Sequence, residues 1–131
     1  MAKWVDQGET DVLKVYFSGE QAHRGTLYLG LYTNATEPDE TATLADIVEP
    51  SGAGYARQAI ADSEWSVSGD TATAAAKTFQ ASGGSWGDVT GYFIATSADN
   101  SGLLLAVEHF DAAKNIGDGD SIQITAKVTI D

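Results

Sequence analysis

The clearest pattern in the sequence is Ile122-Gln-Ile-Thr-Ala-Lys-Val-Thr-Ile130. Apolar side chains occupy every second position of this stretch, and polar side chains fill the positions between them. Successive side chains of a β-strand point to opposite faces, so this alternation predicts a strand with one face in a core and one in solvent. The stretch therefore indicates a β protein.

Similar patterns recur along the chain. Residues 26–33 place three leucines on one face of a predicted strand. Residues 89–96 and 103–110 are two further β-prone segments, and residues 97–102 between them are rich in Ser, Asp, Asn and Gly. Two such segments on either side of a polar loop predict a β-hairpin.

Shorter segments complete the expected sheet structure. Residues 55–61 and 65–67 have the pattern of strands, and residues 71–79, mostly Ala and Thr, predict one strand with small side chains. Residues 44–48 fit either a short strand or a helical turn. With about seven or eight short strands separated by Gly-containing turns, we expect an all-β, single-domain β-sandwich of jelly-roll-like type, with a barrel as the alternative.

The first 25 residues differ from the rest. Val12, Leu13, Tyr16 and Phe17 have helical spacing, with Thr10 as a candidate cap and Gly19 as a candidate end, although the β propensity around Tyr16 leaves a strand open. We therefore divide the chain into residues 1–25, an arm with a possible short helix, and residues 26–131, the sandwich domain.

Trp4 and Val5 are the only large apolar residues among residues 2–8. Because the sandwich is predicted to begin later, we expect both side chains to pack on a partner chain. Deletion of residues 1–8 is then expected to weaken that contact and to leave thermal stability nearly unchanged.

Composition excludes several classes of function. The formal net charge is −12, which disfavours nucleic acid and anionic membranes as partners. There is no Cys, so disulfides and thiolate metal sites are ruled out. No apolar run has the length of a secretory signal or a membrane span, and we expect synthesis in a cytoplasm.

No pattern in the sequence points to catalysis. His23 and His109 are the only histidines, and neither lies in a nucleophile, phosphate-binding or cofactor motif. We therefore expect neither an enzyme nor a cofactor. Asp118 and Asp120 form a candidate Ca²⁺ pair, although a tight hairpin turn explains the same residues equally well.

Aromatic residues are the remaining candidates for binding. Trp65, Trp86, Tyr92 and Phe93 are candidates for a sugar site, but aromatic residues on strands usually belong to the core. We expect a core position for Trp65. Trp86 lies in a Gly/Ser loop and is the best candidate for a contact with a partner.

Four motifs together resemble a known family. They are Leu29-Gly-Leu-Tyr-Thr-Asn34, Gly54-Tyr-Ala-Arg-Gln58, Trp65-Ser-Val-Ser-Gly69 and Gly91-Tyr-Phe-Ile-Ala95. Their order, over residues 26–130, resembles that in small virion structural proteins of tailed bacteriophages. The resemblance implies a component of the phage particle, with no catalytic residues.

Within that family the first expectation is a capsid decoration, or cement, protein. Such a protein would lie on the outer capsid surface, bridge subunits of the major capsid protein and form a homo-oligomer, with a trimer as the suggested state. The first alternative is a tail or fibre component involved in host attachment. A carbohydrate-binding module is a further alternative, from a different functional class.

Overall fold

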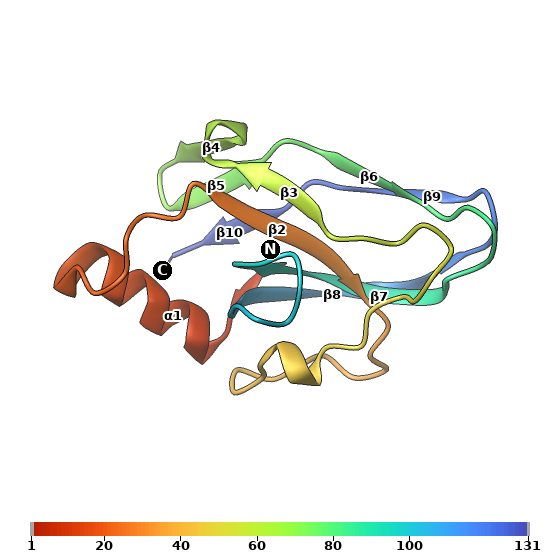
Figure 1. The fold of residues 1–131 in the computed structure, drawn as a ribbon, viewed down its shortest axis with the longest axis horizontal. Coiled ribbons are helices and arrows are strands. Elements are labelled where there is room, and N and C mark those ends of the chain that lie inside the picture. Colours follow the sequence, from red (N-terminus) through yellow and green to blue (C-terminus); the bar gives the residue numbers. More distant parts are fainter. Residues whose placement is uncertain (1, 131) are drawn as a thin grey trace.

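A five-stranded antiparallel sheet forms one layer of the protein in the computed structural model, which describes residues 2–130 (Figure 1). In spatial order its strands are β1 (Lys3–Trp4), β8 (Leu104–Ile116), β7 (Gly87–Ala95), β2 (Thr26–Tyr32) and β3 (Gln58–Ala61). Two smaller sheets face it. One consists of β10 (Lys127–Thr129), β5 (Thr71–Ala74) and β4 (Trp65–Ser68), and the other of β6 (Lys77–Gln80) and β9 (Ser121–Ile124). The all-β prediction is confirmed.

The predicted hairpin forms the centre of the large sheet. β7 and β8 pair antiparallel, from Gly87 opposite Ile116 to Ala95 opposite Leu104. The strand predicted over residues 26–33 is β2, which pairs with β7 on one side and β3 on the other. The hairpin was recognisable because both strands carry long runs of buried apolar residues around a polar loop.

Two segments predicted as single strands are each divided into two. Residues 71–79 form β5 and β6, and the C-terminal stretch forms β9 and β10. β5 pairs with β10 and β6 pairs with β9, so the two breaks lie side by side and the paired strands bend together. At the bend the Ala74 amide donates to the Ala126 carbonyl (2.9 Å), and Ala126 is fully buried. Small alanines permit this sharp change of direction, which alternation in the sequence cannot reveal.

The central part of the large sheet is buried on both faces. Leu29, Leu31 and Ile60 face the smaller sheets, as the alternation predicted. On the opposite face, Tyr32 and Phe93 pack beneath the loop that follows β2, which carries a short 3₁₀ turn, η2 (Leu44–Asp46). A second 3₁₀ turn, η3 (Asp62–Glu64), leads from β3 to β4 and so from one layer to the other.

The predicted short helix is present as α1 (Asp6–Leu13), followed by a π-helical turn, η1 (Lys14–Ser18). Val5, and not Thr10, is the N-cap residue. Gly8 faces β8 so closely that a Cβ atom would collide with the backbone of Leu105, so glycine sets how near the helix lies to the sheet. Gly19, with φ of 68°, ends the helical segment as predicted.

The N-terminal segment is part of the folded domain, which corrects the expectation of a loose arm. β1 pairs with β8, and the Val5 amide donates to the Leu105 carbonyl (3.0 Å). Val5 is fully buried, with 0% exposure, in the cluster that contains Tyr32 and Phe93. Deleting residues 1–8 would remove these contacts, so a loss of stability is now expected. No helix in the described part of the chain is long and apolar enough to cross a membrane.

Candidate binding groove

The two layers separate at the end of the molecule where α1 lies, and a groove opens between them. Its volume is about 670 Å³. The large sheet contributes Leu27, Ile60, Ile94 and Leu105, and the facing sheet contributes Trp65, Val67, Ala72 and Val128. These side chains point inward from strands of opposite layers, as core residues do, but no side chain of residues 2–130 fills the space between them.

The rim of the groove carries a few polar residues. Asp62 lies 3.4 Å from His23, between a carboxylate oxygen and the ring Nε2. Arg24 donates two hydrogen bonds to the buried carboxylate of Asp11, at 3.0 and 2.8 Å, and this pair raises the pKa of the arginine. Asp70 is exposed on the opposite side. Asp11 and Asp62 thus have partners, whereas Asp70 at the rim and Glu9 and Glu20 on the helical segment are exposed. The wall of the groove itself is apolar.

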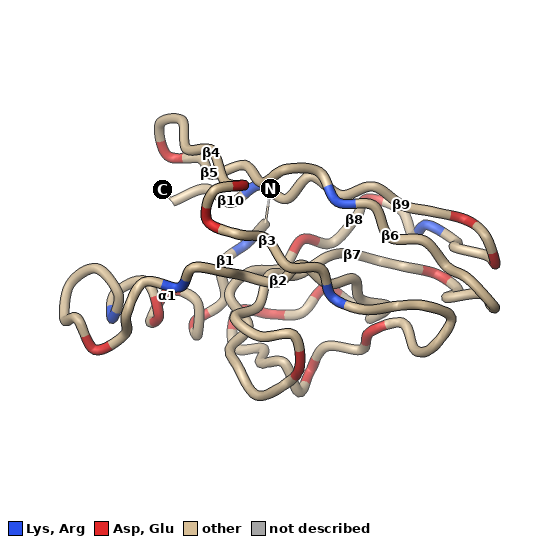
Figure 2. Tube along the Cα trace, turned by 45° about the horizontal axis from the view of Figure 1, so that its top comes forward, with Lys and Arg blue, Asp and Glu red and all other residues tan. Residues whose placement is uncertain are grey.

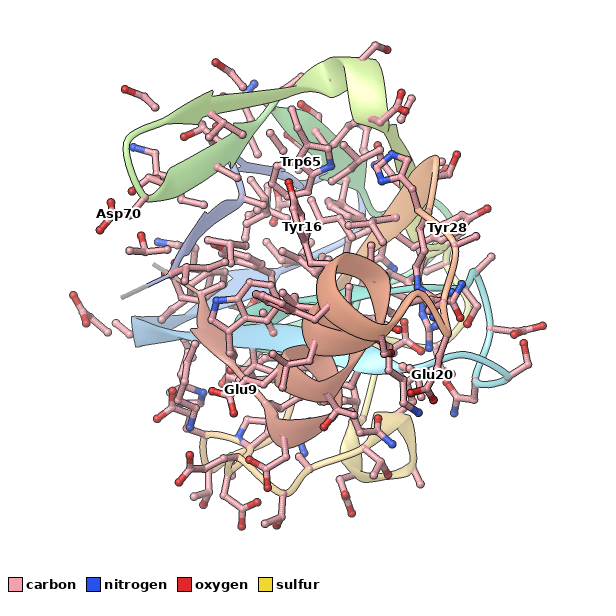
Figure 3. All side chains as sticks on the ribbon, turned by 90° about the vertical axis from the view of Figure 1, so that its left-hand side faces the viewer. Glu9, Tyr16, Glu20, Tyr28, Trp65 and Asp70 are labelled. Carbon is pink, nitrogen blue, oxygen red and sulfur yellow. The ribbon has the colours of Figure 1, made fainter. Side chains whose placement is uncertain are left out.

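Tyr16 and Phe17, on the π-helical turn η1, are the most exposed large apolar side chains, at 82% and 80%. Figure 3 shows Tyr16 standing at the mouth of the groove and pointing towards Trp65. The two rings of η1 lie 6.4 Å apart between centroids. They are exposed because α1 turns Gly8 and Asp11, not its apolar residues, towards β8.

More exposed apolar surface borders the groove. Leu13 at the end of α1, Val67 on β4 and Ile130 after β10 are all more than half exposed. Contiguous apolar patches larger than a few hundred square ångströms are uncommon on monomeric proteins and usually mark an interaction site. The arrangement is suited to binding an apolar surface or segment.

Trp65 adds one specific feature to the wall. Its indole Nε1 is buried and has no hydrogen-bond partner among the described residues. Burying a donor without an acceptor costs about 1–3 kcal/mol.

A second hollow, of about 520 Å³, is polar and lies along β8. Its residues include Glu37, Asp111 and His109. The Nδ1 of His109 lies 3.2 Å from the Tyr32 hydroxyl, and the two rings stack with centroids 5.8 Å apart. Burial, then the nearby glutamates, raise the pKa of Tyr32. His109 thus has a structural partner, and this hollow is less enclosed by apolar surface than the groove.

The opposite end of the sandwich is closed by aromatic residues, which explains the Gly54–Gln58 motif. The Tyr55 ring stacks on Phe79 and meets Trp86 edge-on, with centroids 6.3 and 5.6 Å away. Its hydroxyl donates to Glu49 (2.6 Å) and accepts from the Leu31 amide (2.9 Å). Burial, followed by the contact with Glu49, raises the pKa of Tyr55.

Arg57, from the same motif, packs on the outer face of the large sheet and also donates to the Ser97 carbonyl in the loop between β7 and β8. Its guanidinium donates two hydrogen bonds to Glu49, both of 2.9 Å, and lies 5.0 Å from the centre of the Phe93 ring. The contacts of Tyr55 and Arg57 in this motif therefore hold neighbouring segments of the sandwich together.

The three predicted contact residues, Trp4, Val5 and Trp86, lie in different environments in the structure. Trp4 lines the groove, and its Nε1 donates to the Thr129 carbonyl (2.9 Å). Val5 is core, as described above. Trp86 is only 8% exposed and donates through Nε1 to the Ala53 carbonyl (3.2 Å), so its prediction as an exposed contact residue is wrong. Its loop folds back over the core, which the Gly/Ser composition did not indicate.

The candidate sugar-binding aromatics do not form an exposed platform. Tyr92 and Phe93 are buried along with Trp86, and burial raises the pKa of Tyr92 to about 12. Trp65, expected in the core, is half-buried at the groove.

Asp118 and Asp120 both hold the turn between β8 and β9. Asp118 accepts from the Gly83 amide (3.0 Å) and Asp120 from the Gly117 amide (2.9 Å). Among the described residues, no third acidic or histidine side chain joins them in a metal-binding group. Both carboxylates therefore make the contacts of a tight turn, which was the alternative to a Ca²⁺ site.

The sequence predicted neither the groove nor the exposure of Tyr16 and Phe17 beside it. The available signal was the helical spacing of four apolar residues, which predicted a short helix but not which of its side chains are exposed. Figure 2 shows acidic residues spread around the whole molecule, with few basic residues among them. A partner must therefore either be basic or bind through a surface with little net charge.

Comparison with known proteins adds a family. A family model described as Podophage GP4 fiber I protein gp80 matches residues 3–130. No curated protein matches the chain.

Proposed function

The chain belongs to the podophage GP4 fiber I protein gp80 family and is thus a phage virion structural protein, and we propose that it is a fibre component that takes part in host attachment. The observation that carries this proposal is the match to a fibre protein family over nearly the whole chain. The coarse resemblance to virion structural proteins is confirmed. The match favours the fibre alternative over capsid decoration, which was the first expectation.

The structure supports a role in assembly. Its conspicuous surface is an apolar groove beside two exposed aromatic side chains, which is suited to a protein contact. A non-catalytic role is part of the proposal, since His109 is held by Tyr32 and His23 lies beside Asp62 at the surface. The predicted contact with the major capsid protein stays a prediction.

Location on the particle is the first test. Gold-labelled antibody against this chain should decorate fibres in electron micrographs of the source phage. Label spread over the heads would instead support capsid decoration and overturn the proposal. Absence of label from intact and partly disrupted particles would also contradict it.

Host attachment requires a separate test. Purified chain, added to host cells before the phage, should lower the rate of phage adsorption, and antibody bound to particles should do the same. A non-host strain provides the control. If the label lies on fibres and adsorption is unchanged by both treatments, the chain is a structural part of the fibre without a role in attachment.

A further inference from the structure

We propose that the groove is occupied by the η1 segment of a second copy of this chain, with Phe17 as the inserted side chain. The inference deepens the proposed fibre role and rests on it, because a fibre is an assembly of chains. It assigns a partner to a large apolar surface that the described residues leave uncovered.

Complementary parts lie at the same end of one molecule. The groove is an apolar hollow between the layers, and Phe17 is an apolar projection beside it. A two-fold arrangement of two copies lets each projection enter the other copy's groove, because a surface that carries both parts is self-complementary. π-helical turns such as η1 are rare and often occur at functional sites.

The exposed area is sufficient for a stable contact. At four-fifths exposure, Tyr16 and Phe17 each leave roughly 120–200 Å² accessible. With Leu13, Val67 and Ile130, also more than half exposed, the apolar area is on the order of 600 Å² per copy, close to the ~800 Å² per partner of a standard interface. The walls of the groove add to this area once it is filled.

Charge at this end suits a second copy better than it suits a strongly basic partner. Copies with a net charge of −12 repel one another, so their contact needs a surface where charge is paired or absent. Asp62 and Asp11 are both paired, with His23 and Arg24. Among the acidic residues that line the groove, Asp70 is left without an ion pair to another described residue.

The remaining charges are complementary between copies. Lys14 is exposed on η1, three positions before Phe17, and makes no ion pair with the described residues. Asp70 is exposed at the rim of the groove. A copy that inserts Phe17 brings its Lys14 towards this rim, where it can meet Asp70.

Sedimentation velocity of the full chain over a wide concentration range tests the proposal. The wild type should form an assembly with a mass that is a multiple of 13.7 kDa. Phe17→Ser and Val67→Glu should each weaken association by about tenfold or more. Val48→Glu is the matched control, because Val48 is also exposed, at 57%, but does not line the groove.

A cross-link identifies the contact independently of stability. The chain has no Cys, so Phe17→Cys protein mixed with Val67→Cys protein can form only disulfides between introduced residues. A disulfide between these two variants should form faster than one between Phe17→Cys and Val48→Cys proteins. Circular dichroism of each variant establishes that it is folded.

Three results would overturn the inference. One is a monomeric wild type at every concentration, and another is association that both Phe17→Ser and Val67→Glu leave intact. The third is a wild-type chain that is monomeric in solution and whose Val67→Glu variant no longer enters fibres. A different virion protein would then fill the groove. Since gold labelling of fibres does not depend on self-association, failure here leaves the proposed function standing.

Discussion

The two ends of the sandwich use the same kinds of side chain in opposite ways. At the β6–β9 end, Tyr55, Phe79 and Trp86 fill the space between the layers. At the α1 end, Trp4 and Trp65 line a space that stays open. Figure 1 shows these two ends on opposite sides of the molecule. The difference indicates that one end stabilises the monomer, while the other keeps apolar surface for a contact.

Substitution of Trp86 should show the largest difference between the ends. Trp86→Ala removes a buried indole and leaves a cavity, so the free energy of unfolding should fall by about 3–5 kcal/mol. Tyr16→Ala at the open end should change it by no more than about 0.5 kcal/mol. Urea unfolding followed by far-ultraviolet circular dichroism measures both. Equal losses would contradict the comparison.

The buried Arg57–Glu49 ion pair should have the next largest effect. Arg57→Met keeps most of the side-chain volume but leaves Glu49 without its guanidinium, so we expect a loss of about 2–4 kcal/mol. Lys3→Met is the control, since the Lys3–Glu37 pair is largely exposed and spans 3.8 Å. That control should lose less than about 1 kcal/mol. A loss as large in Lys3→Met would show that burial does not distinguish the two pairs.

Filling the open end should make it resemble the closed end. Ala72→Leu adds apolar atoms to the wall of the groove and should raise stability by about 0.5–1 kcal/mol. The same change should reduce the fluorescence of a neutral apolar dye that binds the groove. Ala59→Leu, on exposed β3 surface outside the groove, is the control for dye binding. Unchanged dye fluorescence in Ala72→Leu would mean that the dye does not occupy the groove.

The smallest effect concerns pH. The hydrogen bond from Lys77 (2.7 Å), followed by that from the Ala61 amide, lowers the pKa of Glu64 below its ordinary value of 4.5. Because the folded pKa is the lower one, ionised Glu64 stabilises the protein above pH 4.5 and this contribution is lost as pH falls through the folded pKa.

Comparison of Glu64→Gln with wild type over the acid range tests this dependence. Unfolding midpoints of the variant should fall less steeply than those of wild type below pH 4.5. Glu20→Gln, a surface substitution, is the matched control. Parallel curves for wild type and Glu64→Gln would contradict the predicted role of Glu64.

Much of the fold could be predicted from local patterns. The β7–β8 hairpin, β2 and the end of the helical segment at Gly19 follow from alternation, loop composition and glycine. The bend that divides β5 from β6 could not be predicted, because Ala75 and Ala76 fit a continuous strand equally well. Only pairing with β9 and β10 determines where the bend falls.

The candidate site was harder to predict than the fold. Trp86 and Tyr16 are both large aromatic residues near Gly or Ser, yet one is buried and the other exposed. Sequence proximity gives no measure of what packs over a side chain. Trp86 is covered by Tyr55, which lies 31 positions away along the chain, whereas Tyr16 has no such cover.

The sequence by itself determined the all-β class, the strong acidic charge and the resemblance to phage virion proteins, because these depend on composition and short-range order. The tertiary structure decided which apolar residues became core and which became surface. Leu105 leaves room for Gly8 of α1 and not for a larger residue, so the helix packs through its small and polar face. That packing directs Tyr16 and Phe17 outward and leaves the groove open, since burial depends on contacts between segments far apart in the sequence.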